Sequence, residues 1–130
     1  MIPTKLKNSI TIHHFVFTIL DLSKTEKFYT KIFGQSLYSN ANTAMYQVGQ
    51  TMLIFTQKEE QNHIGTKFNP SNIGLEHIAF GLKNLEELIE VEKVLVVNNI
   101  QNSGIHIDKS SKKEKIWLND PSNIRIEFYL

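Results

Sequence analysis

The sequence predicts an α+β fold built from two tandem βαβββ modules. Residues 10–34 and 75–99 each read as an extended apolar run followed by a helical pattern. A shift of about 63 residues superposes the two stretches without a gap. The shift pairs His14 with His77, Phe17 with Phe80, Asp21 with Asn84 and Leu22 with Leu85. Two copies of one strand-then-helix unit predict a duplicated fold.

Composition bounds the function classes. The chain has 130 residues, 41% of them apolar, which is enough for one domain with its own core. A formal net charge of +1 argues against a nucleic-acid partner. The chain has no cysteine, which fits a reducing compartment. The sequence shows neither a secretory signal nor an apolar run of about 20 residues, so we expect a cytoplasmic protein without a membrane partner.

The first module is expected over residues 10–57, after an aperiodic arm at 1–9. Its first strand covers 10–20, and a helix follows with Ser23 as N-cap and Glu26 three residues later. Gly34 ends that helix. A short strand is expected at 35–38, and two strands at 44–48 and 51–56 flank a hairpin turn at Gly49-Gln50.

The second module is expected over residues 74–130. A polar connector at 58–73 precedes it, and this connector reads equally as a lid or as a flexible linker. The module then has a strand at 75–82, a helix at 85–97, short strands at 104–107 and 115–118, a turn at 119–123 and a last strand at 124–130. The basic stretch 109–115 reads as a solvated loop, with anion steering as the alternative.

Strand alternation places His14, His77 and Glu127 on comparable faces. His14 shares its face with Val16 and Thr18, opposite the bulkier apolar residues. His77 stands in the matching place, and Glu127 interrupts an apolar final strand where a lone carboxylate is costly to bury. A single strand histidine is usually an ordinary packed or surface residue. Two at equivalent places, with a carboxylate on the corresponding face, predict a divalent-metal site that leaves coordination positions open.

The ordered motifs extend this prediction. His14 precedes Asp21-Leu22 by seven residues, and residues 28–34 read FYTKIFG. His77 lies in EHIAF, and residues 120–127 form an Asp-Pro ending that closes on Glu127. In this order the motifs resemble the vicinal oxygen chelate superfamily of glyoxalases, bleomycin-resistance proteins, fosfomycin-resistance transferases and extradiol dioxygenases.

The resemblance covers nearly the whole chain and implies one glyoxalase-like domain over residues 1–130. It implies a deep incomplete barrel with the helices outside and a metal site between the modules. His14, His77 and Glu127 would hold one divalent metal ion, with Fe, Mn, Zn and Ni not distinguished. Small relatives of this kind commonly pair modules between chains, so we expect a homodimer.

Three positions bear on the family pattern. Glyoxalase I enzymes have a fourth ligand, a Glu, where this chain has Ile54, so we expect no lactoylglutathione lyase activity. Ser122-Asn123 replaces a common Asp-Gly pair that serves the turn. His13 has the opposite parity to His14 and is expected to be a strand-end residue rather than the ligand.

The functional prediction is a metal-dependent enzyme acting on a small oxygen-rich substrate. Isomerase, lyase and ring-opening dioxygenase chemistry remain open. The alternative is a metal-free protein that binds a small molecule, as bleomycin-resistance proteins do. Strand parity also suggests side chains for the substrate pocket, each of which has plain packing as its other role: Thr18, Tyr46, Met52, Ile54, His106, Trp117, Arg125 and Tyr129.

Overall fold

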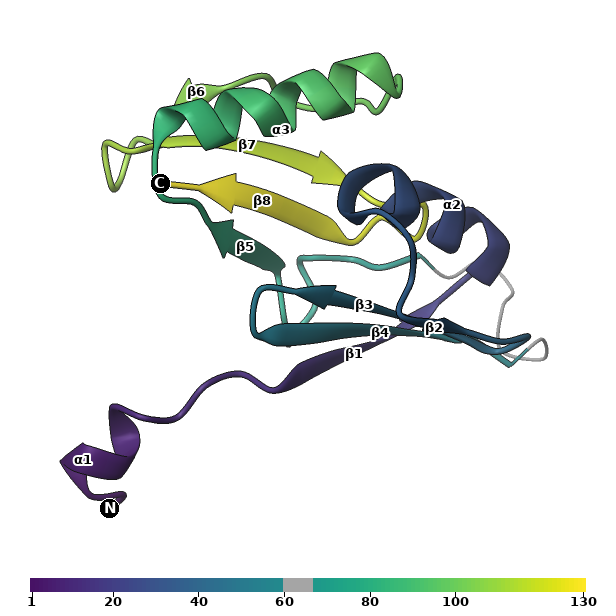
Figure 1. Ribbon diagram of the computed structural model, residues 1–130, viewed down its shortest axis with the longest axis horizontal. Coiled ribbons are helices and arrows are strands. Elements are labelled where there is room, and N and C mark those ends of the chain that lie inside the picture. Colours follow the sequence, from purple (N-terminus) through teal and green to yellow (C-terminus); the bar gives the residue numbers. More distant parts are fainter. Residues whose placement is uncertain (60–66) are drawn as a thin grey trace.

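The structure, a computed structural model that describes residues 1–59 and 67–130, contains two four-stranded mixed sheets of the same topology (Figure 1). Sheet A has the order β1-β4-β3-β2, and sheet B has the order β5-β8-β7-β6. β1 runs parallel to β4, and β5 runs parallel to β8. The other neighbouring strands are antiparallel. The duplicated α+β fold is therefore confirmed, and the sheets do not close into a barrel.

The observed bounds follow the predicted order of elements. The first module contains β1 (His14–Ile19), α2 (Leu22–Phe33), β2 (Tyr38–Ser39), β3 (Thr43–Val48) and β4 (Thr51–Gln57). The second contains β5 (His77–Gly81), α3 (Leu85–Val97), β6 (His106–Ile107), β7 (Glu114–Asn119) and β8 (Arg125–Tyr129).

The N-cap of α2 corrects the sequence prediction. Asp21, not Ser23, is the cap: its backbone is extended, and its Oδ1 accepts the N–H of Lys24 at 2.9 Å. Ser23 already lies inside the helix, so its side chain cannot close the first turn in this way. Asn84 does the same for α3, accepting the N–H of Glu87 at 3.0 Å. The two modules therefore share the N-cap arrangement of their helices as well as the sequence pattern.

The N-terminal arm differs from the aperiodic segment expected. Residues Thr4–Lys7 form a short helix, α1, that projects away from both sheets (Figure 1). The first strand begins at His14 rather than at residue 10 because its register with β4 begins at the pair His14–Met52.

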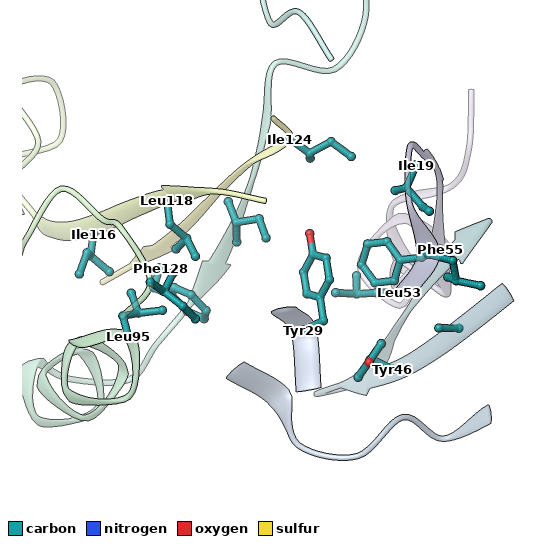
Figure 2. Packing of buried hydrophobic residues seen from close by; sticks show 14 of the residues in the cluster. Ile19, Tyr29, Tyr46, Leu53, Phe55, Leu95, Ile116, Leu118, Ile124 and Phe128 are labelled. Carbon is teal, nitrogen blue, oxygen red and sulfur yellow. The ribbon is translucent and has the colours of Figure 1, made fainter. Parts of the chain in front are cut away.

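Helix α2 joins the two halves of the hydrophobic core. Tyr29 lies between the two groups of buried side chains that the sheets contribute (Figure 2). Its ring stacks on Phe55 of sheet A with a centroid separation of 4.1 Å. One helical turn later, Phe33 meets Phe80 of sheet B edge-to-face at 5.6 Å. The face of sheet A that α2 covers therefore packs against the face of sheet B that α3 covers, within one chain.

A buried polar group also connects the modules. The Tyr29 hydroxyl donates to Asp120 Oδ2 at 3.1 Å, and Asp120 Oδ1 accepts the N–H groups of Ser122 and Ile124. The Ser122 hydroxyl accepts the N–H of Leu20 at 3.0 Å. These bonds satisfy a carboxylate that would be costly to bury alone. They tie the predicted 119–123 turn to the first module.

The connector lies partly outside the described residues, because residues 60–66 are not described. After them, Phe68 bonds to Ser122 and Asn123 through its backbone N–H and C=O. In the described part of the chain, no helix is long and apolar enough to cross a membrane.

Candidate functional site

Each sheet has one face that its own helix does not cover. On sheet B, α3 packs against the side that carries Ile116, Leu118, Ile126 and Phe128. The opposite side is called here the open face of sheet B. By register it carries His77, Ala79, Gly81, Lys115, Trp117, Arg125, Glu127 and Tyr129. Part of it lines a hollow of about 490 Å³ with Asp108 and Ser110.

His77 and Glu127 meet on this face. β5 and β8 run parallel, and His77 Nε2 lies 3.8 Å from Glu127 Oε2. Glu127 is only 4% exposed, whereas the His77 ring reaches the hollow. The other ring nitrogen, Nδ1, lies 3.4 Å from Glu76 Oε1 but has no hydrogen-bond partner. An imidazole and a carboxylate thus direct one donor atom each to a common region.

Lys115 is the residue that sequence reasoning missed. It lies in β7, at the start of the strand predicted at 115–118, and only the end of the basic stretch 109–115 was wrongly counted with the solvated loop; its side chain is half-buried. Its Nζ donates to both carboxylate oxygens of Glu127, at 3.2 and 3.3 Å, and lies 3.3 Å from Asp108 Oδ1. The sequence could have placed Lys115 on this face, because it stands two residues before Trp117 in the same strand and alternation puts both side chains on one side.

Asp108 is held in place by several donors. Its Oδ2 accepts the N–H groups of Ser110 and Ser111 and the Tyr129 hydroxyl. The Ser111 N–H is the main reason that the pKa of Asp108 lies well below its ordinary range, with Lys115 contributing. Burial lowers the pKa of Lys115, but hydrogen bonds to Glu127 and Asp108 outweigh this and raise it overall. The lysine is therefore charged at neutral pH.

His14 lies on a separate surface. It is exposed on β1, beside Val16 and Thr18, on the side of sheet A that α2 does not cover, which is called the open face of sheet A. Its Nδ1 lies 2.8 Å from Nδ1 of His13. Among the described residues, no three His, Cys, Asp or Glu side chains gather closely enough to hold a metal ion. One chain of this structure therefore does not gather His14, His77 and Glu127 around a common point, and their joint role as metal ligands stays a prediction.

The suggested pocket residues divide between the two open faces. Thr18, Met52 and Ile54 lie with His14 on sheet A, because Met52 pairs with His14 and Ile54 with Val16. Trp117, Arg125 and Tyr129 lie with Glu127 on sheet B. The Arg125 guanidinium stacks over the Trp117 ring at 4.0 Å and donates to Asn119.

Two of the suggested residues are placed differently. Tyr46 is buried in the core under α2, where its hydroxyl bonds to Thr30 and to the C=O of Glu26. Tyr46 shares its face of β3 with the buried Ala44, whereas Thr43 and Gln47 lie on the opposite face, so Tyr46 belongs to the core side of the strand. His106 lies at the outer edge of sheet B, where its Nδ1 is 3.0 Å from the Gly104 carbonyl oxygen.

The pair on sheet B fits a divalent metal ion. The two donors are the types that Zn, Mn, Fe and Ni accept, and they are close enough to share one ion. Two protein donors alone make an incomplete site, so a further ligand is needed.

Comparison with known proteins identifies relatives. Residues 11–128 match the family model of the Glyoxalase/Bleomycin resistance protein/Dioxygenase superfamily. The metallothiol transferase FosB of Lysinibacillus sphaericus is 28% identical over 128 residues, covering 92% of this chain and 81% of that protein. A glyoxalase-type protein of Bacillus halodurans has a TM-score of 0.81 at 22% identity, covering 95% and 98% of the two chains. The fosfomycin resistance protein FosX of Listeria monocytogenes has a TM-score of 0.67 at 18% identity, covering 93% and 90%.

Proposed function

Because the chain belongs to the Glyoxalase/Bleomycin resistance protein/Dioxygenase superfamily, we propose that it is a metal-dependent enzyme acting on a small oxygen-rich substrate. The observation that carries the proposal is the His77–Glu127 pair, whose donor atoms lie 3.8 Å apart at an open hollow. The substrate would bind through two adjacent oxygens at coordination positions that the protein leaves free.

Each residue has a distinct part in this proposal. His77 Nε2 and Glu127 Oε2 hold the ion from sheet B, and His14 is the third ligand. A bound divalent ion supplies a Lewis acid that stabilises an oxyanion or enolate as it forms. Arg125, on the same face as Glu127, is held over Trp117 and is positioned to bind a negatively charged part of the substrate. Isomerase, lyase and ring-opening dioxygenase chemistry are the reaction classes to test.

We place the third ligand on a second copy of the chain. Within one chain the two sheets pack through the faces that carry the helices, and no helix of the described residues 1–59 and 67–130 covers either open face. β1 and β5 are each at the edge of a sheet, and such edges invite pairing with another chain. In a twofold dimer, the open face of sheet A from one copy can meet the open face of sheet B from the other. His14 of one copy then completes the site of its partner, and the dimer holds two sites.

Mixing two variants tests this arrangement. His14→Ala and His77→Ala should each lose tight metal binding as homodimers. After joint refolding, a mixed dimer has one site with both substitutions and one intact site. With random pairing, about a quarter of the wild-type metal sites should return, measured by competition with a chromogenic chelator. His13→Ala is the matched control and should bind metal as the wild type does.

The outcomes separate the alternatives. Recovery of sites contradicts a single-chain centre, in which no mixture could restore binding. Failure of the wild-type protein to bind any of Zn, Mn, Fe or Ni would contradict the metal-dependent enzyme. That result would favour a metal-free binding protein of the bleomycin-resistance kind.

The named relatives supply one specific reaction to try. The similarity to a metallothiol transferase, with Lys115 and Arg125 on either side of Glu127 by strand register, makes transfer of a thiol to an anionic substrate a second candidate. It is tested by following thiol consumption in the metal-loaded protein. No thiol loss above the metal-free control would exclude that candidate.

A further inference from the structure

Lys115 contacts the carboxylate that the proposed function assigns to the metal ion. Its ammonium donates to both oxygens of Glu127 and also lies against Asp108. Glu127 is nearly fully buried, so an unpaired charge there would be costly. In this arrangement Lys115 is the cation that compensates Glu127.

The same oxygens are needed for metal binding. An ion coordinated by Glu127 would stand close to the Lys115 ammonium group, and two cations at such short range repel each other. Lys115 and the ion therefore compete for Glu127.

Asp108 offers Lys115 a second partner. Three donors fix Asp108 Oδ2, while Oδ1 faces Lys115 at 3.3 Å. Lys115 can therefore leave Glu127 without losing its ion pair. The cluster of Lys115, Glu127 and Asp108 has one ammonium and two carboxylates and so carries a charge of about −1, which attracts a divalent cation.

We infer that Lys115 is a built-in competitor of the metal ion, which withdraws from Glu127 to Asp108 when the ion binds and thereby sets the metal affinity of the site. The inference rests on the proposed function, because it takes Glu127 as a metal ligand. It assigns to Lys115 a positioning role that is distinct from coordination.

The test measures metal affinity directly. Lys115→Gln removes the competing charge, and its dissociation constant for Zn²⁺ or Mn²⁺ should fall by about tenfold or more, as expected for one charge removed beside the ion. Lys113→Gln is the matched control: it removes the same charge from the exposed end of the neighbouring loop. Its dissociation constant should stay within about twofold of the wild type.

A second variant separates the effect of the charge at position 115 from an effect of misfolding. Lys115→Arg keeps the charge and can bind both Glu127 oxygens with a planar fork, so metal affinity should be equal to or weaker than that of the wild type. Circular dichroism verifies that each variant is folded. In a metal-loaded crystal structure, Lys115 Nζ should lie against Asp108 and beyond hydrogen-bond distance from Glu127.

The results distinguish the two proposals. If the wild type binds metal and Lys115→Gln binds it no more tightly, the inference about Lys115 is overturned while the metal site stands. If neither protein binds metal, both proposals are overturned. Binding by Lys115→Gln that exceeds that of the wild type supports the competition.

Discussion

At the scale of single residues, Asp120 links the fold to pH. Burial raises the pKa of its carboxyl above the ordinary 3.8, against the lowering effect of the N–H groups of Ile124 and Ser122. The folded protein therefore binds this proton more tightly than the unfolded chain. The resulting stabilisation is fully present below about pH 3.8 and is lost as pH rises through the raised folded pKa.

Asp120→Asn isolates this dependence because the amide does not titrate. The unfolding free energy of the wild type, relative to that of the variant, should rise as the pH falls from 7 to 4. Urea denaturation at a series of pH values measures the difference. A difference that stays constant across this range would contradict the assignment to Asp120.

At the same scale, the isoleucine at position 54 leads to a prediction about one specific reaction. It lies on the open face of sheet A with His14, where the glyoxalase I pattern has a glutamate. An isoleucine neither binds a cation nor carries a proton. Loss of a general base commonly costs about 10²–10⁴ in rate, so the metal-loaded protein should not convert the hemithioacetal of methylglyoxal and glutathione efficiently. Turnover of about 10 s⁻¹ or more would show this prediction to be wrong.

At the scale of elements, the α2 cap gives a direct comparison of two neighbouring residues. Asp21→Ala removes the acceptor for the Lys24 N–H and should lower the unfolding free energy by about 0.5–2 kcal/mol. Ser23→Ala is the control and should change it by about 0.5 kcal/mol or less, because Ser23 lies within the helix. Urea denaturation of both variants gives the values. Equal losses, or a larger loss for Ser23→Ala, would restore Ser23 as the cap.

At the scale of the whole molecule, a substitution at Val16 tests the proposed contact between two copies of the chain. Val16 is 58% exposed in one chain and lies between His14 and Thr18 on the open face of sheet A. If this face meets a second copy, Val16→Lys places a charge in the interface and should convert the dimer to a monomer. Light scattering should then give 15.0 kDa in place of twice that mass.

Val97→Lys is the matched control for this substitution. Val97 is 78% exposed on α3, away from both open faces, so the dimer should persist. A wild-type mass of 15.0 kDa at micromolar concentration would contradict the dimer itself. A dimeric Val16→Lys protein would contradict the proposed interface.

Local patterns were sufficient for much of the fold and part of the site. The helix at 85–97 was predicted with its observed bounds, because its apolar stripe and its flanking Asn residues are neighbours in sequence. Alternation of side chains along a strand is equally local, and it put His77 and Glu127 on the corresponding faces of their strands. The cap of α2 was misassigned because Asp21 and Ser23 can both serve as N-caps, and only the backbone angles distinguish them.

The sequence by itself determined the duplicated modules, the faces of their strands and the residue types at the candidate site. Tertiary structure decided which of these surfaces meet. The packing of Tyr29 and Phe33 on sheet B turns the helical sides of the two sheets toward each other, which separates His14 from Glu127 within one chain. The contact of Lys115 with Glu127 depends on the pairing of β7 with β8, and that of Tyr29 with Asp120 joins residues 91 positions apart. Strand periodicity is a local property, whereas these contacts depend on how distant elements pack.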